Sequence, residues 1–264
     1  MAIKHLDVLK LLAAAGLVEA IDGDVKRCAH WARLGPAAAE REPAQIGAEV
    51  MENVLLRWNC ILQAGPAEVA PLYVHKTALA LAVCLHRQGF AHAELTDAAV
   101  AAIAALNAAV ALNDAFHRRS ADIETLLRSP ALMPARRPSQ AKAHTAWRAG
   151  DVVGIQVGDR HHAFHVLEVS QGGPIVEFYD IVQDTPLAWE HLQGVVAHGE
   201  RLNDGRAYVD RHALYGLQDQ PDPAHQFRLL ASGIAQGPDN AHLARHSGLY
   251  AVTDVVRMAR DLLP

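Results

Sequence analysis

The chain has 264 residues, of which 51% are hydrophobic and 20% are charged, and its formal net charge is −5. This length and apolar content predict a globular protein with a substantial core, built as one large domain or two modest ones. The negative charge argues against a nucleic-acid-binding protein, which usually carries a basic face.

The charge is divided unevenly along the chain. Residues 1–145 carry 15 Lys or Arg and 14 acidic residues, whereas residues 146–264 carry nine Arg, no Lys and 15 acidic residues. An acidic C-terminal half can steer a cationic partner toward it. Solubility alone explains such a charge equally well.

Neither a targeting segment nor a membrane span is expected. Asp7 and Lys10 interrupt the short apolar run at the N-terminus, which is unlike a signal peptide. The longest low-charge run, residues 98–113, is shorter than the roughly 20 apolar residues of a bilayer span. The three cysteines lack zinc-ligand spacing and are typical of buried thiols in a reducing compartment. We therefore expect a cytoplasmic protein that binds no membrane.

The first half has apolar residues at helical spacing. We expect this pattern to form a helical domain over residues 1–128. Helices are predicted within residues 4–20, 48–65, 71–89, 96–119 and 121–128.

A different pattern begins after a proline-rich stretch. Residues 129–145, SPALMPARRPSQAKAHT, contain three prolines and little periodicity, which predicts a linker or a strap over the surface. In the stretch that follows, apolar residues alternate with period two, and the turns GDR and SQGG have hairpin length. Residues 146–264 are thus expected to form a small antiparallel sheet, with further strands in RAYVDRHALY and HQFRLLASG and a terminal helix in LYAVTDVVRMARDLL. The fold class is α+β, an N-terminal helical bundle followed by an antiparallel β domain with a C-terminal helix.

The motif HHAFH, in the predicted sheet, contains three histidines. On a strand, His161 and His165 share a face but lie about 13 Å apart, too far for one metal ion, and His162 faces the other side. We expect them to be structural, with His161 and His162 at the exposed start of a strand. His242 and His246, in HLARH, have helical metal-ligand spacing but lack the glutamate of H-E-x-x-H.

No enzyme motif is found in the sequence. The nucleophile elbow, the phosphate-binding loop and the dinucleotide fingerprint are absent. Asp22 and Asp24 flank a glycine, yet the later oxygen ligands of a calcium loop do not follow, and a polar turn is the simpler interpretation. We expect no catalytic residue, no metal ligand and no cofactor.

The stretch WRAGDVVGIQVGDRHHAFHVLEVSQGGPIVEFYDI resembles the start of the immunity protein 26 family, and HSGLYAVTDVVRMARDLL resembles its end. The resemblance covers about residues 146–262; the helical half has no counterpart, and His165 stands where the family usually has a glycine. It implies a bacterial immunity protein that binds a cognate, cytoplasmically acting toxin and neutralises it by occlusion.

Aromatic and acidic residues are concentrated in the third predicted strand and in the loop that follows it. Aromatic anchors with charges around them are typical of tight protein interfaces. We expect the toxin to bind there, through Glu177, Tyr179, Asp180, Asp184, Trp189 and Glu190. Two other functions remain open, a metal-dependent hydrolase that uses clustered histidines and a non-catalytic scaffold or regulatory module.

Overall fold

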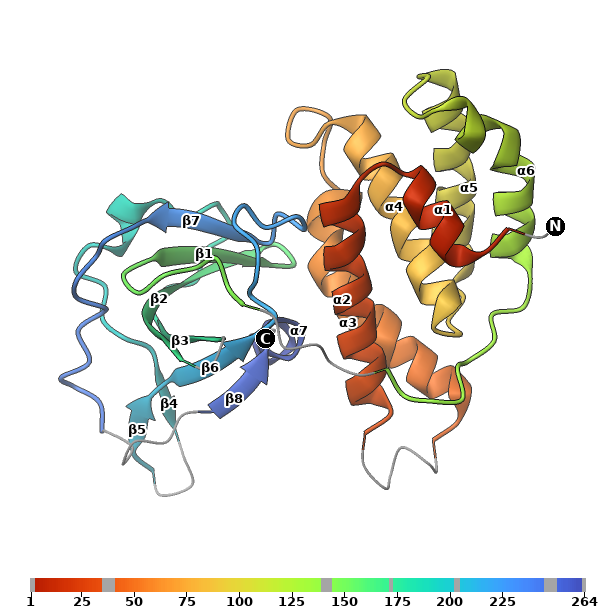
Figure 1. The fold of residues 1–264 in the computed structure, drawn as a ribbon. Coiled ribbons are helices and arrows are strands. Elements are labelled where there is room, and N and C mark those ends of the chain that lie inside the picture. Colours follow the sequence, from red (N-terminus) through yellow and green to blue (C-terminus); the bar gives the residue numbers. More distant parts are fainter. Residues whose placement is uncertain are drawn as a thin grey trace. The chain divides into compact units, whose positions relative to one another are not determined.

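A computed structural model describes residues 3–34, 41–138, 144–170, 173–201, 205–244 and 251–262 (Figure 1). The chain divides into two compact units. Unit 1 comprises Met1–Leu55 and Ile61–Gln140, and unit 2 comprises Leu56–Cys60 and Ala141–Pro264. The main boundary lies within the stretch predicted to be a linker, but five residues of the helical half belong to unit 2.

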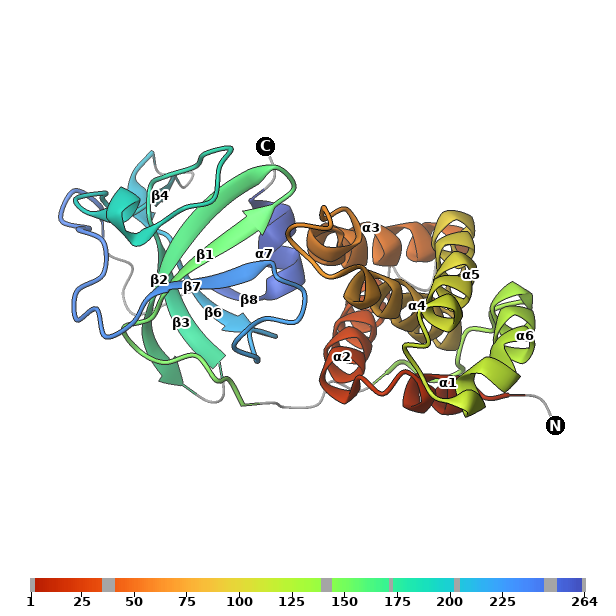
Figure 2. The same ribbon diagram turned by 90° about the horizontal axis from the view of Figure 1, so that it is seen from above.

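Unit 1 is helical, as the sequence predicted. Its central helix is buried on all sides from residue 77 to residue 86, which is typical of a helix at the centre of a bundle. Figure 2 shows this helix, α4, between α2 and α5. The described helices of the unit are α1 (His5–Leu11), α2 (Ala15–Ala32), α3 (Pro43–Leu62), α4 (Pro71–Arg87), α5 (Ala93–Ala108) and α6 (Asp114–Arg128).

Two helix boundaries differ from the prediction. The first predicted helix is two helices, and α2 extends through Asp22 and Asp24, so these two residues do not form a turn. The predicted helix over residues 96–119 breaks after α5, and Val110 has a φ of 50°. The Asn113 side chain then accepts a hydrogen bond from the Phe116 amide at 3.1 Å and caps α6.

A pair of histidines joins α1 to α4 inside unit 1. His86 Nε2 lies 2.9 Å from the carbonyl oxygen of Ser129, which can only accept, so this nitrogen donates. The other ring nitrogen of His86, Nδ1, lies 2.8 Å from Nε2 of His5. Burial, followed by the charges of His86 and Arg87, lowers the pKa of His5. The lowered pKa favours the neutral form of His5 in the folded protein.

The proline-rich stretch, residues 129–145, contacts α2 and the residue after it. His30 of α2 and Arg33, the residue after this helix, bond to the carbonyl oxygens of Pro138 and Pro134 at 3.0 and 3.1 Å. Gly89, with a φ of 87°, lets Met133 approach so closely that a Cβ atom at Gly89 would lie 2.3 Å from the Met133 Cα. Residues 129–138 therefore run as a strap over unit 1, without helix or strand.

Unit 2 contains a six-stranded mixed sheet in the order β7-β1-β2-β3-β6-β8, so β7 lies at one edge and β8 at the other (Figure 1). The predicted meander is confirmed, because β1 pairs antiparallel with β2 and β2 with β3. The sheet is mixed because β8 runs parallel to β6. The strands are β1 (Val152–Val157), β2 (Arg160–Ser170), β3 (Gly173–Phe178), β6 (Arg211–Tyr215), β7 (Phe227–Ala231) and β8 (Ala251–Asp254), and a separate pair is formed by β4 (Gly199–Arg201) and β5 (Ala207–Val209).

The end of the chain differs from the prediction. The stretch predicted to be one terminal helix begins with β8, and only Val255–Asp261 forms the helix α7. The side chain of Asp254 accepts hydrogen bonds from the amides of Val256 and Arg257 at 3.0 and 3.1 Å. This N-cap starts the helix where the β-branched residues of the strand end.

Both faces of the sheet are covered near its centre. Phe164 packs against Phe178 and Phe227 on one face, with ring centroids 5.5 and 6.3 Å apart. On the other face, Val152 and Ala163 pack against the segment after β3, including Leu187 and Leu192. The 3-10 helix η2 (Trp189–Leu192) belongs to this covering segment.

A buried ion pair lies inside unit 2. Arg57 donates to both carboxylate oxygens of Asp222, at 2.7 and 3.2 Å, and their side chains are 5% and 4% exposed. The same carboxylate accepts the backbone amides of Gln226 and Phe227, both at 3.0 Å. Arg57 thus reaches unit 2 from the five-residue segment of α3 that belongs to it.

Among the helices that the structure describes, none combines the length and hydropathy that a membrane crossing requires.

We predict that Asp222→Asn lowers the free energy of unfolding by about 3–5 kcal/mol, because it leaves the Arg57 guanidinium buried without a counter-charge. Urea unfolding of the full chain, followed by tryptophan fluorescence, measures the loss. The control is Asp97→Asn, which removes an exposed 3.3 Å pair with Arg128 and is expected to cost less than about 1 kcal/mol. Equal losses in the two variants would contradict the assigned role of Asp222.

Candidate partner-binding surface

The histidines of HHAFH lie on β2, as predicted. The register with β1 places His161 opposite Gln156, His162 opposite Ile155 and His165 opposite Val152. Nε2 of the buried His165 lies 2.9 Å from the carbonyl oxygen of Ile234 and donates to it. Within the described ranges, no three His, Cys, Asp or Glu side chains are grouped so that they could hold a metal ion. His242 is exposed, and His246 lies outside the described residues.

The expectation that His162 is exposed is wrong. Its side chain is on the phenylalanine face of the sheet, the residue is 7% exposed, and its Nε2 has no hydrogen-bond partner among the described residues. Burial, followed by the charges of Arg160, His161 and His198, lowers the pKa of His162. His162 is therefore a neutral core residue whose protonation opposes folding.

Two of the residues expected to contact a partner are buried, which corrects the prediction. Glu177 is 1% exposed; its two oxygens accept from Arg211 at 2.7 Å and from Asn240 at 2.8 Å. Tyr179 is 5% exposed and belongs to the core cluster under the segment that follows β3. Burial, followed by the charge of Glu177, raises the pKa of Tyr179 to about 12. Both side chains stabilise the sheet from within and cannot touch a partner without rearrangement.

The other residues of the predicted set lie in the segment after β3. Asp180, Asp184 and Glu190 are exposed, whereas Trp189 is half-buried and packs against the core cluster. The Asp180 amide donates to the carbonyl oxygen of Val196 at 2.9 Å, which holds the start of this segment against its end.

Apolar residues lie among these acids. Val182 and Val196 are 50% and 37% exposed. We call five exposed residues of this segment the acidic loop surface: Asp180, Val182, Asp184, Glu190 and Val196.

Few cations are available to neutralise this surface. Residues 161–200 contain six acidic residues and neither Lys nor Arg. Asp184 lies 3.4 Å from Arg160, and Asp180 lies 3.0 Å from Nδ1 of His198, but all four side chains are at least 46% exposed. Exposed pairs of this kind contribute at most about 1 kcal/mol, so a partner can replace them.

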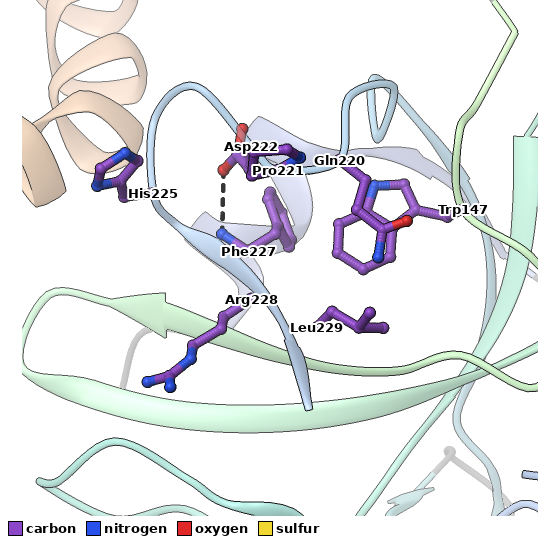
Figure 3. A pocket seen from close by; sticks show the side chains of 8 residues that line it. All are labelled: Trp147, Gln220, Pro221, Asp222, His225, Phe227, Arg228 and Leu229. Carbon is purple, nitrogen blue, oxygen red and sulfur yellow. Dashed lines mark hydrogen bonds between the residues drawn. The ribbon is translucent and has the colours of Figure 1, made fainter. Parts of the chain in front are cut away.

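A second feature of unit 2 is a pocket of about 460 Å³ beside β7 (Figure 3). Trp147 is fixed in its wall, because its indole Nε1 donates to the carbonyl oxygen of Asp219 at 3.1 Å. Figure 3 shows the Arg228 side chain directed away from Trp147 and Asp222 bonded to the Phe227 amide. The lining residues are Trp147, Gln220, Pro221, Asp222, His225, Phe227, Arg228 and Leu229.

The carboxylate that lines the pocket is already engaged in hydrogen bonds. The carboxylate of Asp222 already accepts from Arg57 and from the backbone amides of Ala224, Gln226 and Phe227, so its lone pairs are engaged. The remaining described lining groups are an imidazole, a guanidinium, an amide and apolar side chains. The sequence analysis missed this pocket, although the prolines at 221 and 223 around Asp222 signal a rigid loop.

Comparisons with known proteins found no similarity: no protein-family model matches the chain, and no curated protein or solved structure matches it.

We predict that unit 2 loses stability as the pH falls below about 6.5, the ordinary pKa of His in an unfolded chain. The folded-state pKa of His162 is lower, so the unfolded chain binds the proton first and protonation favours unfolding. Urea unfolding at pH 7.5 and pH 5 measures this loss. His162→Gln should reduce the loss in free energy of unfolding between pH 7.5 and pH 5, whatever its effect on the stability at pH 7.5.

His242→Gln is the matched control, because His242 is exposed in the same unit. Its pH-dependent loss should equal that of the unaltered protein. The interpretation of His162 fails if His162→Gln leaves the loss unchanged as well.

Proposed function

We propose that this protein is an immunity protein that binds a toxin acting in the cytoplasm and neutralises it by covering its active surface. The acidic loop surface is the proposed contact site. The observation that carries the proposal is the combination of exposed Asp180, Asp184 and Glu190 with exposed Val182 and Val196 in a stretch without Lys or Arg. The resemblance of residues 146–262 to the immunity protein 26 family supports the same function.

The composition of the surface suits a protein partner. Interfaces typically combine an apolar centre that is removed from water with a polar and charged rim. In this surface the two valines supply apolar area, and the acids supply charge that remains hydrated until the partner arrives. Charges at a rim mainly raise the association rate and select the partner.

The negative charge of the acidic loop surface also indicates which kind of toxin it would bind. A toxin that acts on nucleic acid or nucleotides presents Lys and Arg to bind phosphate groups. An acidic surface that covers those cations competes with the substrate directly. The proposed toxin therefore has a positively charged active surface, and occlusion requires no chemical step.

The test co-expresses the chain with the toxin encoded beside it, which should restore growth. The double variant Asp184→Lys and Glu190→Lys reverses two exposed charges without touching the core. We expect it to weaken toxin binding at least tenfold and to reduce growth rescue, because like charges then face each other across the contact. Calorimetric titration at two salt concentrations should show weaker binding of the unaltered chain at the higher one.

Glu19→Lys is the control, since Glu19 is exposed on α2 in unit 1. It should bind and rescue like the unaltered chain. If the unaltered chain neither binds the toxin nor restores growth, the proposed function is wrong. If it binds but the double variant binds equally well, the contact lies elsewhere.

A further inference from the structure

The outer edge of β7 has backbone groups for which no described residue supplies a hydrogen-bond partner. The amide of Gln156 donates to the carbonyl oxygen of Gln226 at 3.0 Å, so Phe227 and Ile155 form a non-hydrogen-bonded pair of the antiparallel ladder. Because the pattern alternates, Arg228 directs its amide and carbonyl toward β1. Leu229 therefore directs its amide and carbonyl away from the sheet.

The described residues occupy only the first part of this edge. The Phe227 amide points outward and donates to Asp222 at 3.0 Å. For the Leu229 amide and carbonyl, no described residue supplies a hydrogen-bond partner. Unpaired groups at a sheet edge are a template for a further strand.

The pocket lies at the same edge. Leu229, which is 38% exposed, and Phe227 line it from the strand, and Trp147 and Pro221 line it from the preceding segments (Figure 3). A residue placed opposite Leu229 on an added strand would direct its side chain to the same face as Leu229. Phe227 and Leu229 lie on the same face of the sheet, so the side chain of the added residue would be directed to the pocket.

Arg228 adds a charge preference on the opposite face of β7. It is exposed, and the neighbours of the pocket-filling residue on an added strand would lie on its side of the sheet. A carboxylate at one of these positions would face the guanidinium. A second copy of β7 brings no carboxylate, because its sequence FRLLA contains none.

We propose that the edge of β7 binds an extended segment of a partner protein, with an aromatic or aliphatic side chain in the pocket and acidic residues on either side of it. The segment adds to the sheet through the Leu229 amide and carbonyl. This inference goes beyond the proposed function and does not depend on it, since the acidic loop surface is made of other residues.

The test uses the full chain and the acetylated, amidated peptide Ser-Thr-Glu-Trp-Glu-Thr-Ser as the probe. Amide exchange by nuclear magnetic resonance should first show the Leu229 amide exchanging at least tenfold faster than the Arg228 amide. Adding the peptide should slow exchange at Leu229. Slow exchange at both amides before the peptide is added would overturn the proposal.

Two N-methylated peptides separate strand addition from simple pocket filling. Methylation of the Trp nitrogen blocks the bond to the Leu229 carbonyl and should weaken binding at least tenfold. Methylation of the following Glu nitrogen, which faces away from β7, should leave binding unchanged. Equal binding of the two peptides, or equally tight binding of N-acetyl-tryptophanamide, would show a small-molecule pocket and overturn the proposal.

Variants of the chain test the same contact from the other side. Leu229→Pro removes the outward amide but no bond to β1, and it should abolish peptide binding. Arg228→Glu should weaken binding of the Glu-Trp-Glu peptide at least tenfold relative to its Lys-Trp-Lys counterpart. This second variant tests the contact even if the proline of Leu229→Pro disrupts the strand. Sedimentation that shows a dimer, with the Leu229 amide protected in it, would identify a second copy as the occupant and overturn the proposal.

Discussion

The buried pair of Arg57 and Asp222 is the constraint on which unit 2 depends. A buried carboxylate is costly unless its lone pairs are filled, and Asp222 fills them with a bidentate guanidinium and with the backbone amides of its own loop. The pair therefore fixes the loop that enters β7, and with it one wall of the pocket. The same rule explains Glu177, which is buried between Arg211 and Asn240 and serves the sheet. In this unit the most deeply buried acids are structural, whereas the acids of the acidic loop surface are open to a partner.

Local patterns predicted much of the fold. The apolar spacing of the helical half and the period-two alternation of residues 149–182 reflect burial that each element achieves against its neighbours, so they are visible in one sequence. The break at residues 109–113 was missed because neither glycine nor proline marks it, and only the capping side chain of Asn113 does. The start of α7 was misplaced because the β-branched residues before Asp254 suit a strand that pairs with β6, a partner some forty residues earlier in the chain.

The candidate site was harder to predict for a physical reason. Alternation along β3 separates two faces, but all six residues of the strand are buried because parts of the chain outside the strand cover both faces. Nothing in the alternation of Glu177 and Tyr179 shows that the segment around Leu187 and Leu192 packs on Tyr179. The acids beyond the strand were placed correctly at the surface because loop residues have no second layer above them. The pocket was missed entirely, since Trp147 and Leu229 are 82 residues apart and meet only in the folded sheet.

The contribution of Leu56–Cys60 to unit 2 limits how the two halves of the gene can recombine during evolution. A gene fragment that encodes residues 141–264 alone would specify an interior carboxylate without its cation. Recombination at the proline-rich strap would therefore yield a hybrid with an electrostatic defect at its centre. The two halves can be exchanged between related genes only if the incoming helical half has an arginine at the position of Arg57. We therefore expect Arg57 and Asp222 to be inherited together.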